Sequence, residues 1–249
     1  MNKALRVAWR LLAVAIWLLW GGLLALLLLR LNTQKGYSVF QLKLVRWWSG
    51  RLLVILGVRL SVSGQIQDAP IWVANHVSWL DIVVLMSIAP SRFLSKAEVA
   101  GWPLIGWLAQ RAGTVFMRRG AGEVDAATAQ LRHLVGLGDR VLFFPEGTSS
   151  ASAPLKFHAR LFSLPVSLSS SIAPVAVMYH DTLVKPRSDL AYIGEQTFVQ
   201  SLTYLLAQEQ LVAQVCLLPS IDALALSRNA LADAAHTSIS NAWHDMGNL

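Results

Sequence analysis

A histidine and an aspartate five residues apart are the side chains in this sequence best suited to chemistry. His76 and Asp81 lie in Asn-His-Val-Ser-Trp-Leu-Asp, directly after residues 71–74, an apolar run typical of a buried strand. A carboxylate that accepts the proton of one imidazole nitrogen leaves the other nitrogen free to act as a base. The pair therefore predicts machinery that activates a hydroxyl. A solvated loop histidine followed by a helix-initiating aspartate is the alternative.

The spacing also predicts where the two residues lie. Five residues along an ideal helix leave two side chains on different faces, so both cannot lie in one regular helix and still touch. We expect His76 in a loop at the rim of a sheet and Asp81 in the first turn of the next helix, where the helix dipole favours a carboxylate.

Two arginines follow another strand-like run. Arg118 and Arg119 come directly after residues 114–117, in Gly-Thr-Val-Phe-Met-Arg-Arg. Adjacent strand residues face opposite sides of a sheet, so only one arginine can point into a given site, where it can hold a phosphate through two hydrogen bonds. A pair of surface arginines on a basic protein is the alternative.

A proline–glycine turn follows a third apolar run. Residues 141–144 lead into Pro-Glu-Gly-Thr, in which Gly147 permits a close approach or a positive φ angle. We expect Glu146 at the same sheet edge as His76 and Arg119. An ordinary polar turn is the alternative.

The composition indicates a protein that associates with membranes. Its 249 residues are 55% hydrophobic and only 14% charged, and 21 Lys+Arg against 14 Asp+Glu give a net charge of +7. A basic, apolar, tryptophan-rich chain suits an anionic lipid surface better than nucleic acid, since the sequence has no zinc-finger spacing or aromatic RNA-binding signature. The single cysteine, Cys216, excludes an internal disulfide.

Residues 11–29 form a run of apolar or small residues that is long enough to span a bilayer. A cleaved signal peptide is the alternative, but the sequence after Arg30 offers no small-residue cleavage site. Basic residues flank the run on both sides, so the positive-inside rule does not choose an orientation. Residues 37–58 have the pattern of a helix that lies among lipid head groups. A helical hairpin that dips into one leaflet is slightly favoured over a simple span.

After residue 57 short β-rich runs alternate with helical patterns, which predicts an α/β fold with a mixed sheet flanked by helices. We divide the chain into a membrane anchor with an interfacial helix, residues 1–57, and a second domain, residues 58–249. The expected strands are 58–62, 71–74, 92–95, 114–117, 141–144, 172–179, 190–193 and 211–217. The clearest expected helices are 123–137 and 227–243.

Four segments, in order, resemble the motif blocks of the 1-acylglycerol-3-phosphate acyltransferase superfamily, membrane enzymes that acylate lysophospholipids and related acceptors. The matching residues are His76 and Asp81 of a His-x4-Asp block, Gly113, Phe116 and Arg119 of a Gly-x-x-Phe-x-x-Arg block, residues 144–148 of Phe-Pro-Glu-Gly-Thr, and Pro174 of a final proline block. The matched region covers nearly half of the chain, and its first and third blocks are quite specific.

Two departures from the family pattern concern the acceptor lipid. Many family members that use lysophosphatidate have arginine after Glu-Gly-Thr, where this chain has Ser149. In this respect the chain is similar to the branch that includes lyso-ornithine lipid acyltransferases. The family often continues with Phe-Lys-x-Gly, of which this chain keeps Lys156 and loses the glycine.

The resemblance implies a glycerolipid acyltransferase-like fold and a membrane-bound O-acyltransferase of phospholipid biosynthesis. Such an enzyme moves a fatty acyl group from acyl-CoA or acyl carrier protein to the hydroxyl of a lysolipid, in the first place 1-acyl-sn-glycerol-3-phosphate (lysophosphatidic acid), giving phosphatidic acid. The implied catalytic residues are His76 and Asp81. The implied substrate-binding residues are Arg119, Glu146, Gly147, Thr148 and Lys156. The resemblance implies no metal and no cofactor, and a location in a bacterial inner membrane with the site on its cytoplasmic face.

Alternatives remain at three levels. Lyso-ornithine lipid or another lysophospholipid is the alternative acceptor. A metal hydrolase would use His76, Asp81 and Glu146 as ligands, but the sequence lacks a His-x3-His pair or similar cluster. A non-catalytic membrane adaptor would explain the anchor and the charge, but has no need of a His–Asp pair. The head group, the donor, the chain length, the anchor topology and the oligomeric state stay open.

Overall fold

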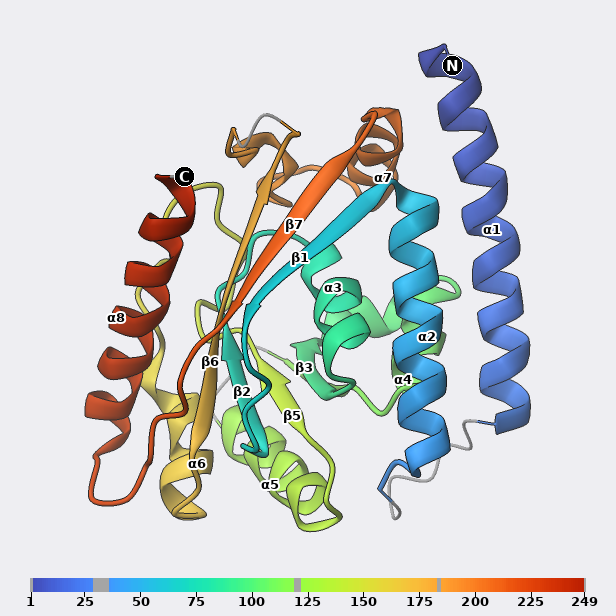
Figure 1. Cartoon of the computed structure of the whole chain (residues 1–249). Coiled ribbons are helices and arrows are strands. Elements are labelled where there is room, and N and C mark those ends of the chain that lie inside the picture. Colours follow the sequence, from blue (N-terminus) through green and yellow to red (C-terminus); the bar gives the residue numbers. More distant parts are fainter. Residues whose placement is uncertain (1, 29–35, 119–121, 183–184, 249) are drawn as a thin grey trace.

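The computed structural model describes residues 2–28, 36–118, 122–182 and 185–248 (Figure 1). The strands in these residues are β1 (Val58–Gly64), β2 (Ile71–Ala74), β3 (Arg92–Lys96), β4 (Val115–Met117), β5 (Val141–Phe143), β6 (Ile172–His180) and β7 (Leu211–Leu217). They form one sheet in the order β1-β7-β6-β2-β5-β3-β4. Neighbours are parallel except β6 and β7, which are antiparallel. The predicted mixed sheet is confirmed.

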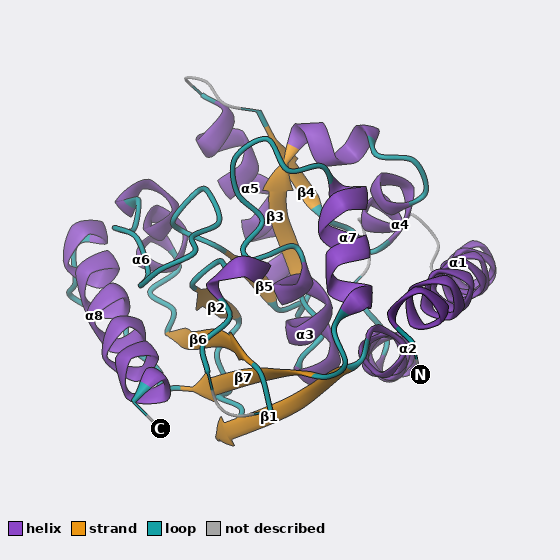
Figure 2. Ribbon diagram, turned by 90° about the horizontal axis from the view of Figure 1, so that it is seen from above, coloured by secondary structure: helices purple, strands orange, loops and turns teal. Residues whose placement is uncertain are grey.

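Helices cover both faces of this sheet (Figure 2). The α-helices are α1 (Lys3–Leu28), α2 (Val39–Leu56), α3 (Leu80–Ile88), α4 (Ile105–Arg111), α5 (Glu123–Gly136), α6 (Ser163–Ser167), α7 (Phe198–Ala207) and α8 (Arg228–Gly247). Short 3-10 helices are Ala97–Gly101, Ala159–Phe162 and Ser188–Leu190.

Strand β2 shows how the sheet divides the core into two layers. Trp72 and Ala74 belong to the hydrophobic cluster that includes side chains of α2, α3 and α7. Ile71 and Val73 belong to the cluster that includes side chains of α5 and α8. Successive side chains of a strand face opposite sides, so a strand covered on both faces must be apolar throughout. The carboxyl end of β2, which leads into His76, is therefore held in the centre of the molecule.

Helix α2 begins and ends with well-defined caps. The Ser38 hydroxyl accepts a hydrogen bond from the Gln41 amide, and the Gln41 side chain accepts one from the Ser38 amide, which forms a capping box. The helix ends at Gly57, whose φ of 77° is the left-handed conformation that favours glycine. Leu52, Leu53 and other side chains of α2 lie in the same core as α3. Helix α2 thus shares a core with the sheet, and the division of the chain at residue 57 stays a prediction.

Helix α1 runs antiparallel to α2 (Figure 1) and is fastened to the end of α7. Arg6 donates to the carbonyl of Ala207 at 2.8 Å, and Arg10 donates to the carbonyls of Leu206 and Gln208 at 3.1 and 2.6 Å. The last carbonyls of a helix have no partner inside the helix, and cationic side chains satisfy them well. These two arginines therefore dock α1 on the domain, besides adding positive charge beside the apolar run.

The strand predicted at residues 190–193 is wrong. A 3-10 helix, Ser188–Leu190, occupies the start of this segment, and a loop follows. The apolar pattern reflects burial, since Leu190 and Ala191 are buried, but Tyr192 gives its amide hydrogen to the carbonyl of Val77 at 3.0 Å. The segment therefore supports the loop after β2 and pairs with no strand of the described structure. The other predicted strands end within two residues of the observed ones.

Candidate active site

The loop after β2 and the first turn of α3 bring His76 and Asp81 together. Strand β2 ends at Ala74 and α3 begins at Leu80, so the histidine lies in the loop and the aspartate in the first helical turn, as predicted. His76 Nδ1 lies 2.8 Å from Asp81 Oδ2. The His76 side chain is 19% exposed and the Asp81 side chain is fully buried. The contact involves Nδ1 of the ring and not Nε2.

The Asp81 carboxylate is held by four donors. Besides His76, Oδ2 accepts the backbone amides of Val77 and Ser78 at 2.7 and 2.9 Å, and Oδ1 accepts the Tyr179 hydroxyl at 2.7 Å. Burial and the charge of Asp81 raise the pKa of Tyr179 well above its usual value, so this hydroxyl keeps its proton and donates. A buried carboxylate needs such partners. With all its other donors fixed, Asp81 accepts the Nδ1 proton and makes Nε2 the basic nitrogen.

Further contacts hold the His76 ring and the loop that carries it. The ring stacks on Phe144, with ring centroids 4.1 Å apart and planes at 15°. The buried Asn75 side chain exchanges two hydrogen bonds with the backbone of Val177 in β6, at 2.9 and 2.7 Å. No role was predicted from the sequence for Asn75 or Tyr179. The period of two in β6 places Tyr179 on the same strand face as Val175 and Val177, but it does not indicate the contact with Asp81.

Glu146 joins the turn after β5 to the histidine loop. Its Oε1 accepts the backbone amide of His76 at 2.7 Å, and its Oε2 accepts the amide of Leu155 at 2.9 Å. Burial raises the pKa of Glu146 to about 7, although these two amides and His76 act in the opposite direction. The residue is 3% exposed. Glu146 lies at the sheet edge beside His76, as predicted, and it fastens two loops; a role in substrate binding stays a prediction.

The remaining predicted binding residues differ in how the structure places them. Gly147 has a φ of 68°, as its motif position predicted, and it is exposed together with Thr148. Lys156 is exposed on the loop that follows Leu155. Arg119 lies outside the described residues, directly after the exposed Arg118 that follows β4.

The motif glycine Gly113 has a structural explanation. Its φ is 68°, and a Cβ atom built on it would lie 2.0 Å from Nη1 of Arg92. Arg92 is buried and donates through Nε to Oδ2 of Asp139 at 2.7 Å. Glycine at this position therefore leaves room for Arg92 and its buried ion pair with Asp139.

The comparisons with known proteins agree on one family. The model of the Acyltransferase family matches residues 58–178. A lyso-ornithine lipid O-acyltransferase of Pseudomonas aeruginosa is 40% identical over 199 residues, which are 79% of this chain and 77% of that protein. A 1-acyl-sn-glycerol-3-phosphate acyltransferase of Neisseria meningitidis serogroup B is 34% identical over 146 residues, 57% of each chain.

A solved structure shows the same fold. The crystal structure of the 1-acyl-sn-glycerophosphate acyltransferase PlsC from Thermotoga maritima matches with a TM-score of 0.70 at 17% identity, covering 98% of this chain and 95% of that one. The family model and the similarity to these relatives show an acyltransferase. The chain belongs to the 1-acylglycerol-3-phosphate acyltransferase superfamily.

Proposed function

We propose that this protein is a membrane-bound O-acyltransferase that esterifies the free hydroxyl of a lysolipid with a fatty acyl group from an acyl thioester. The observation that carries the proposal is the 2.8 Å contact between His76 Nδ1 and Asp81 Oδ2. It leaves Nε2 as a base at the sheet edge where ligands of α/β folds bind. The similarity to lysolipid acyltransferases supports the choice of substrates.

The reaction needs one base and no covalent enzyme intermediate. His76 Nε2 takes the proton of the acceptor hydroxyl while its oxygen forms a bond to the thioester carbonyl carbon. The carbon–sulfur bond then breaks, and the thiolate that leaves takes up the proton from the imidazolium. The products are an ester and a free thiol. Asp81 stabilises the imidazolium between these two proton transfers.

The acyl donor is acyl-CoA or acyl carrier protein, and the protein needs no other cofactor. We assign Arg119 to an anionic group of the substrates, because a guanidinium binds phosphate or carboxylate through two hydrogen bonds. Gly147 and Thr148 form the exposed turn beside His76. Two acceptors are candidates: 1-acyl-sn-glycerol-3-phosphate, and lyso-ornithine lipid, which Ser149 in place of the arginine favours.

Membrane attachment is assigned to α1. This helix is long and apolar enough to cross a bilayer, and large apolar side chains such as Leu12, Leu19 and Leu27 are exposed along it. Its antiparallel packing on α2 supports the hairpin in one leaflet over the simple span. In such a hairpin the site faces the cytoplasmic side of a bacterial inner membrane, where acyl thioesters are made.

The test is turnover by the purified full chain in lipid nanodiscs. Acyl-CoA is supplied with or without lysolipid, free thiol is measured, and lipid products are identified by mass spectrometry. We expect lysolipid-dependent thiol release, its loss in His76→Ala, and wild-type rates in the control His244→Ala, since His244 is exposed on α8. Near-normal turnover by His76→Ala would overturn the base assignment. Thiol release without an esterified lysolipid would overturn acyl transfer.

A further inference from the structure

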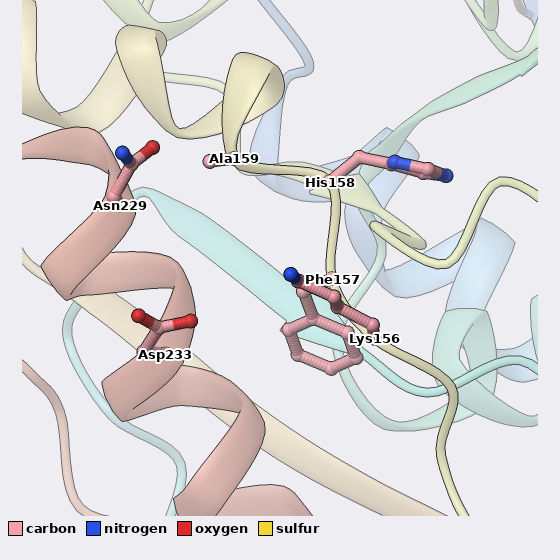
Figure 3. A pocket seen from close by; sticks show the side chains of 6 residues that line it. All are labelled: Lys156, Phe157, His158, Ala159, Asn229 and Asp233. Carbon is pink, nitrogen blue, oxygen red and sulfur yellow. The ribbon is translucent and has the colours of Figure 1, made fainter.

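A surface cavity of about 370 Å³ opens between the loop after β5 and the start of α8 (Figure 3). One wall is the loop that leads from Leu155 to the 3-10 helix Ala159–Phe162, and the opposite wall is the first two turns of α8. The cavity is lined by Lys156, Phe157, His158, Ala159, Asn229 and Asp233. Its size lies within the range of sites that bind small ligands or lipid head groups.

Two opposite charges face this cavity and do not neutralise each other. Figure 3 shows Asp233 and Asn229 on α8, both facing the loop that carries Lys156. Lys156 and Asp233 are exposed, and neither belongs to an ion pair among the residues that the structure describes. An ammonium, a carboxylate and an amide are therefore all available to one ligand. This set matches a zwitterion, whereas a ligand that carries negative charge alone would lie beside the like charge of Asp233.

The wall with Lys156 is joined by hydrogen bonds to the proposed catalytic residues. The amide of Leu155 donates to Glu146 Oε2 at 2.9 Å, and Glu146 Oε1 accepts the amide of His76 at 2.7 Å. The amide of His158 donates to the carbonyl of Pro145 at 2.9 Å. The loop is thus fixed at both ends to the turn after β5. A head group in the cavity would lie next to the turn that supports the base.

We propose that this cavity binds the head group of the acceptor, and that the acceptor class is a lysolipid with an amino-acid head group that carries both a carboxylate and an ammonium. Lys156 binds the carboxylate, Asp233 binds the ammonium, and Asn229 adds a hydrogen bond to either. Ornithine acylated on its α-amino group has this pair of charges. The inference rests on the proposed function, and it assigns to Asp233 a selection against phosphate heads, which would lie beside its like charge.

The experiment measures KM and kcat for two acceptors with the same acyl chain, lyso-ornithine lipid and 1-acyl-sn-glycerol-3-phosphate. Asp233→Asn keeps the shape of the side chain and removes its charge, and Asp233→Lys reverses the charge. The matched control is Asp245→Asn, an exposed aspartate on the same helix outside the cavity. We expect Asp233→Asn to raise the KM for lyso-ornithine lipid about twofold to fivefold, as for an exposed charge pair, with less effect on kcat.

The same variants should act in the opposite direction on the phosphate acceptor. We expect Asp233→Asn to lower the KM for 1-acyl-sn-glycerol-3-phosphate, and Asp233→Lys to lower it further. Equal changes for both acceptors, or kinetics like those of Asp245→Asn, would overturn the head-group assignment while acyl transfer persists. If the wild type acylates neither acceptor, the proposed function fails instead. A wild type that acylates only the phosphate acceptor also overturns the amino-acid class.

Discussion

Replacing Asp81 by asparagine separates the charge of this side chain from its role as an acceptor. The amides of Val77 and Ser78 both point at Oδ2, so the asparagine oxygen takes that position. The new amide nitrogen then faces the Tyr179 hydroxyl, which can turn and accept. His76 keeps an acceptor for its Nδ1 proton and Nε2 stays basic. Only the negative charge beside the imidazolium is lost.

The size of the effect follows from the distance between the groups. The 2.8 Å contact places the two charge centres about 4 Å apart, where the attraction at an effective dielectric constant of about 20 is about 4 kcal/mol. A loss of that size in the transition state lowers kcat about a thousandfold. The acceptor KM should change little, because the charge develops only as the proton moves.

The assay is thiol release by Asp81→Asn beside wild type, His76→Ala and Tyr179→Phe. Tyr179→Phe leaves the His76 contact in place, and we expect it to reduce kcat less than about tenfold, as the loss of one hydrogen bond would. Asp81→Asn should lie between Tyr179→Phe and His76→Ala. Activity within tenfold of wild type would refute charge stabilisation by Asp81. Activity as low as that of His76→Ala would refute the argument that the two amides preserve the histidine tautomer.

Three further substitutions test other parts of the site. Gly113→Ala should destabilise the protein by about 3 kcal/mol, because the new methyl group displaces buried Arg92 from its ion pair, whereas Gly136→Ala, with open space around it, should not lower the melting temperature. Glu146→Gln leaves one of two buried backbone amides without an acceptor. The pKa of Glu146 is raised to about 7 in the folded state, so the folded protein holds this proton more tightly than the unfolded chain does. This contribution to the free energy of unfolding is fully present below about pH 4.5 and is lost as the pH rises through about 7. The melting-temperature advantage of wild type over Glu146→Gln should therefore shrink between about pH 5 and pH 8; growth over that interval would contradict the raised pKa. Arg119→Ala should raise the acceptor KM more than it lowers kcat, and an unchanged KM would place Arg119 outside the pocket.

The sequence was sufficient to predict the sheet and the histidine–aspartate pair because both depend on local patterns. A short run of apolar residues indicates a strand that is buried on both faces. The spacing of five residues between His76 and Asp81 indicates that one lies in a loop and the other in the first turn of a helix. The edge shared by His76 and Glu146, 70 residues apart, was also predictable, because the carboxyl ends of parallel strands meet at one edge. The strand predicted at residues 190–193 was wrong because the apolar residues of a loop can be buried as well as those of a strand.

Interactions between distant polar groups were not predictable. No local pattern shows that Arg6 and Arg10 donate to the end of α7, or that Tyr179 donates to Asp81, since each contact joins elements that only the folded chain brings together. The contacts of Glu146 were also not predictable. Its motif position indicated contact with a substrate, but in the structure both of its carboxylate oxygens accept backbone amides.

This difference also explains why the acceptor is harder to infer than the reaction. The groups that act on the hydroxyl lie in short motifs at the ends of β2 and β5, where spacing alone indicates chemistry. Asp233 lies in α8, beyond the region that the family model matches, and it lines the same cavity as Lys156 only because α8 lies beside the loop after β5. Charges supplied by such an element can change between relatives without disturbing His76 and Asp81. Acceptor selectivity should therefore follow the charge at position 233, while the base and its carboxylate stay the same.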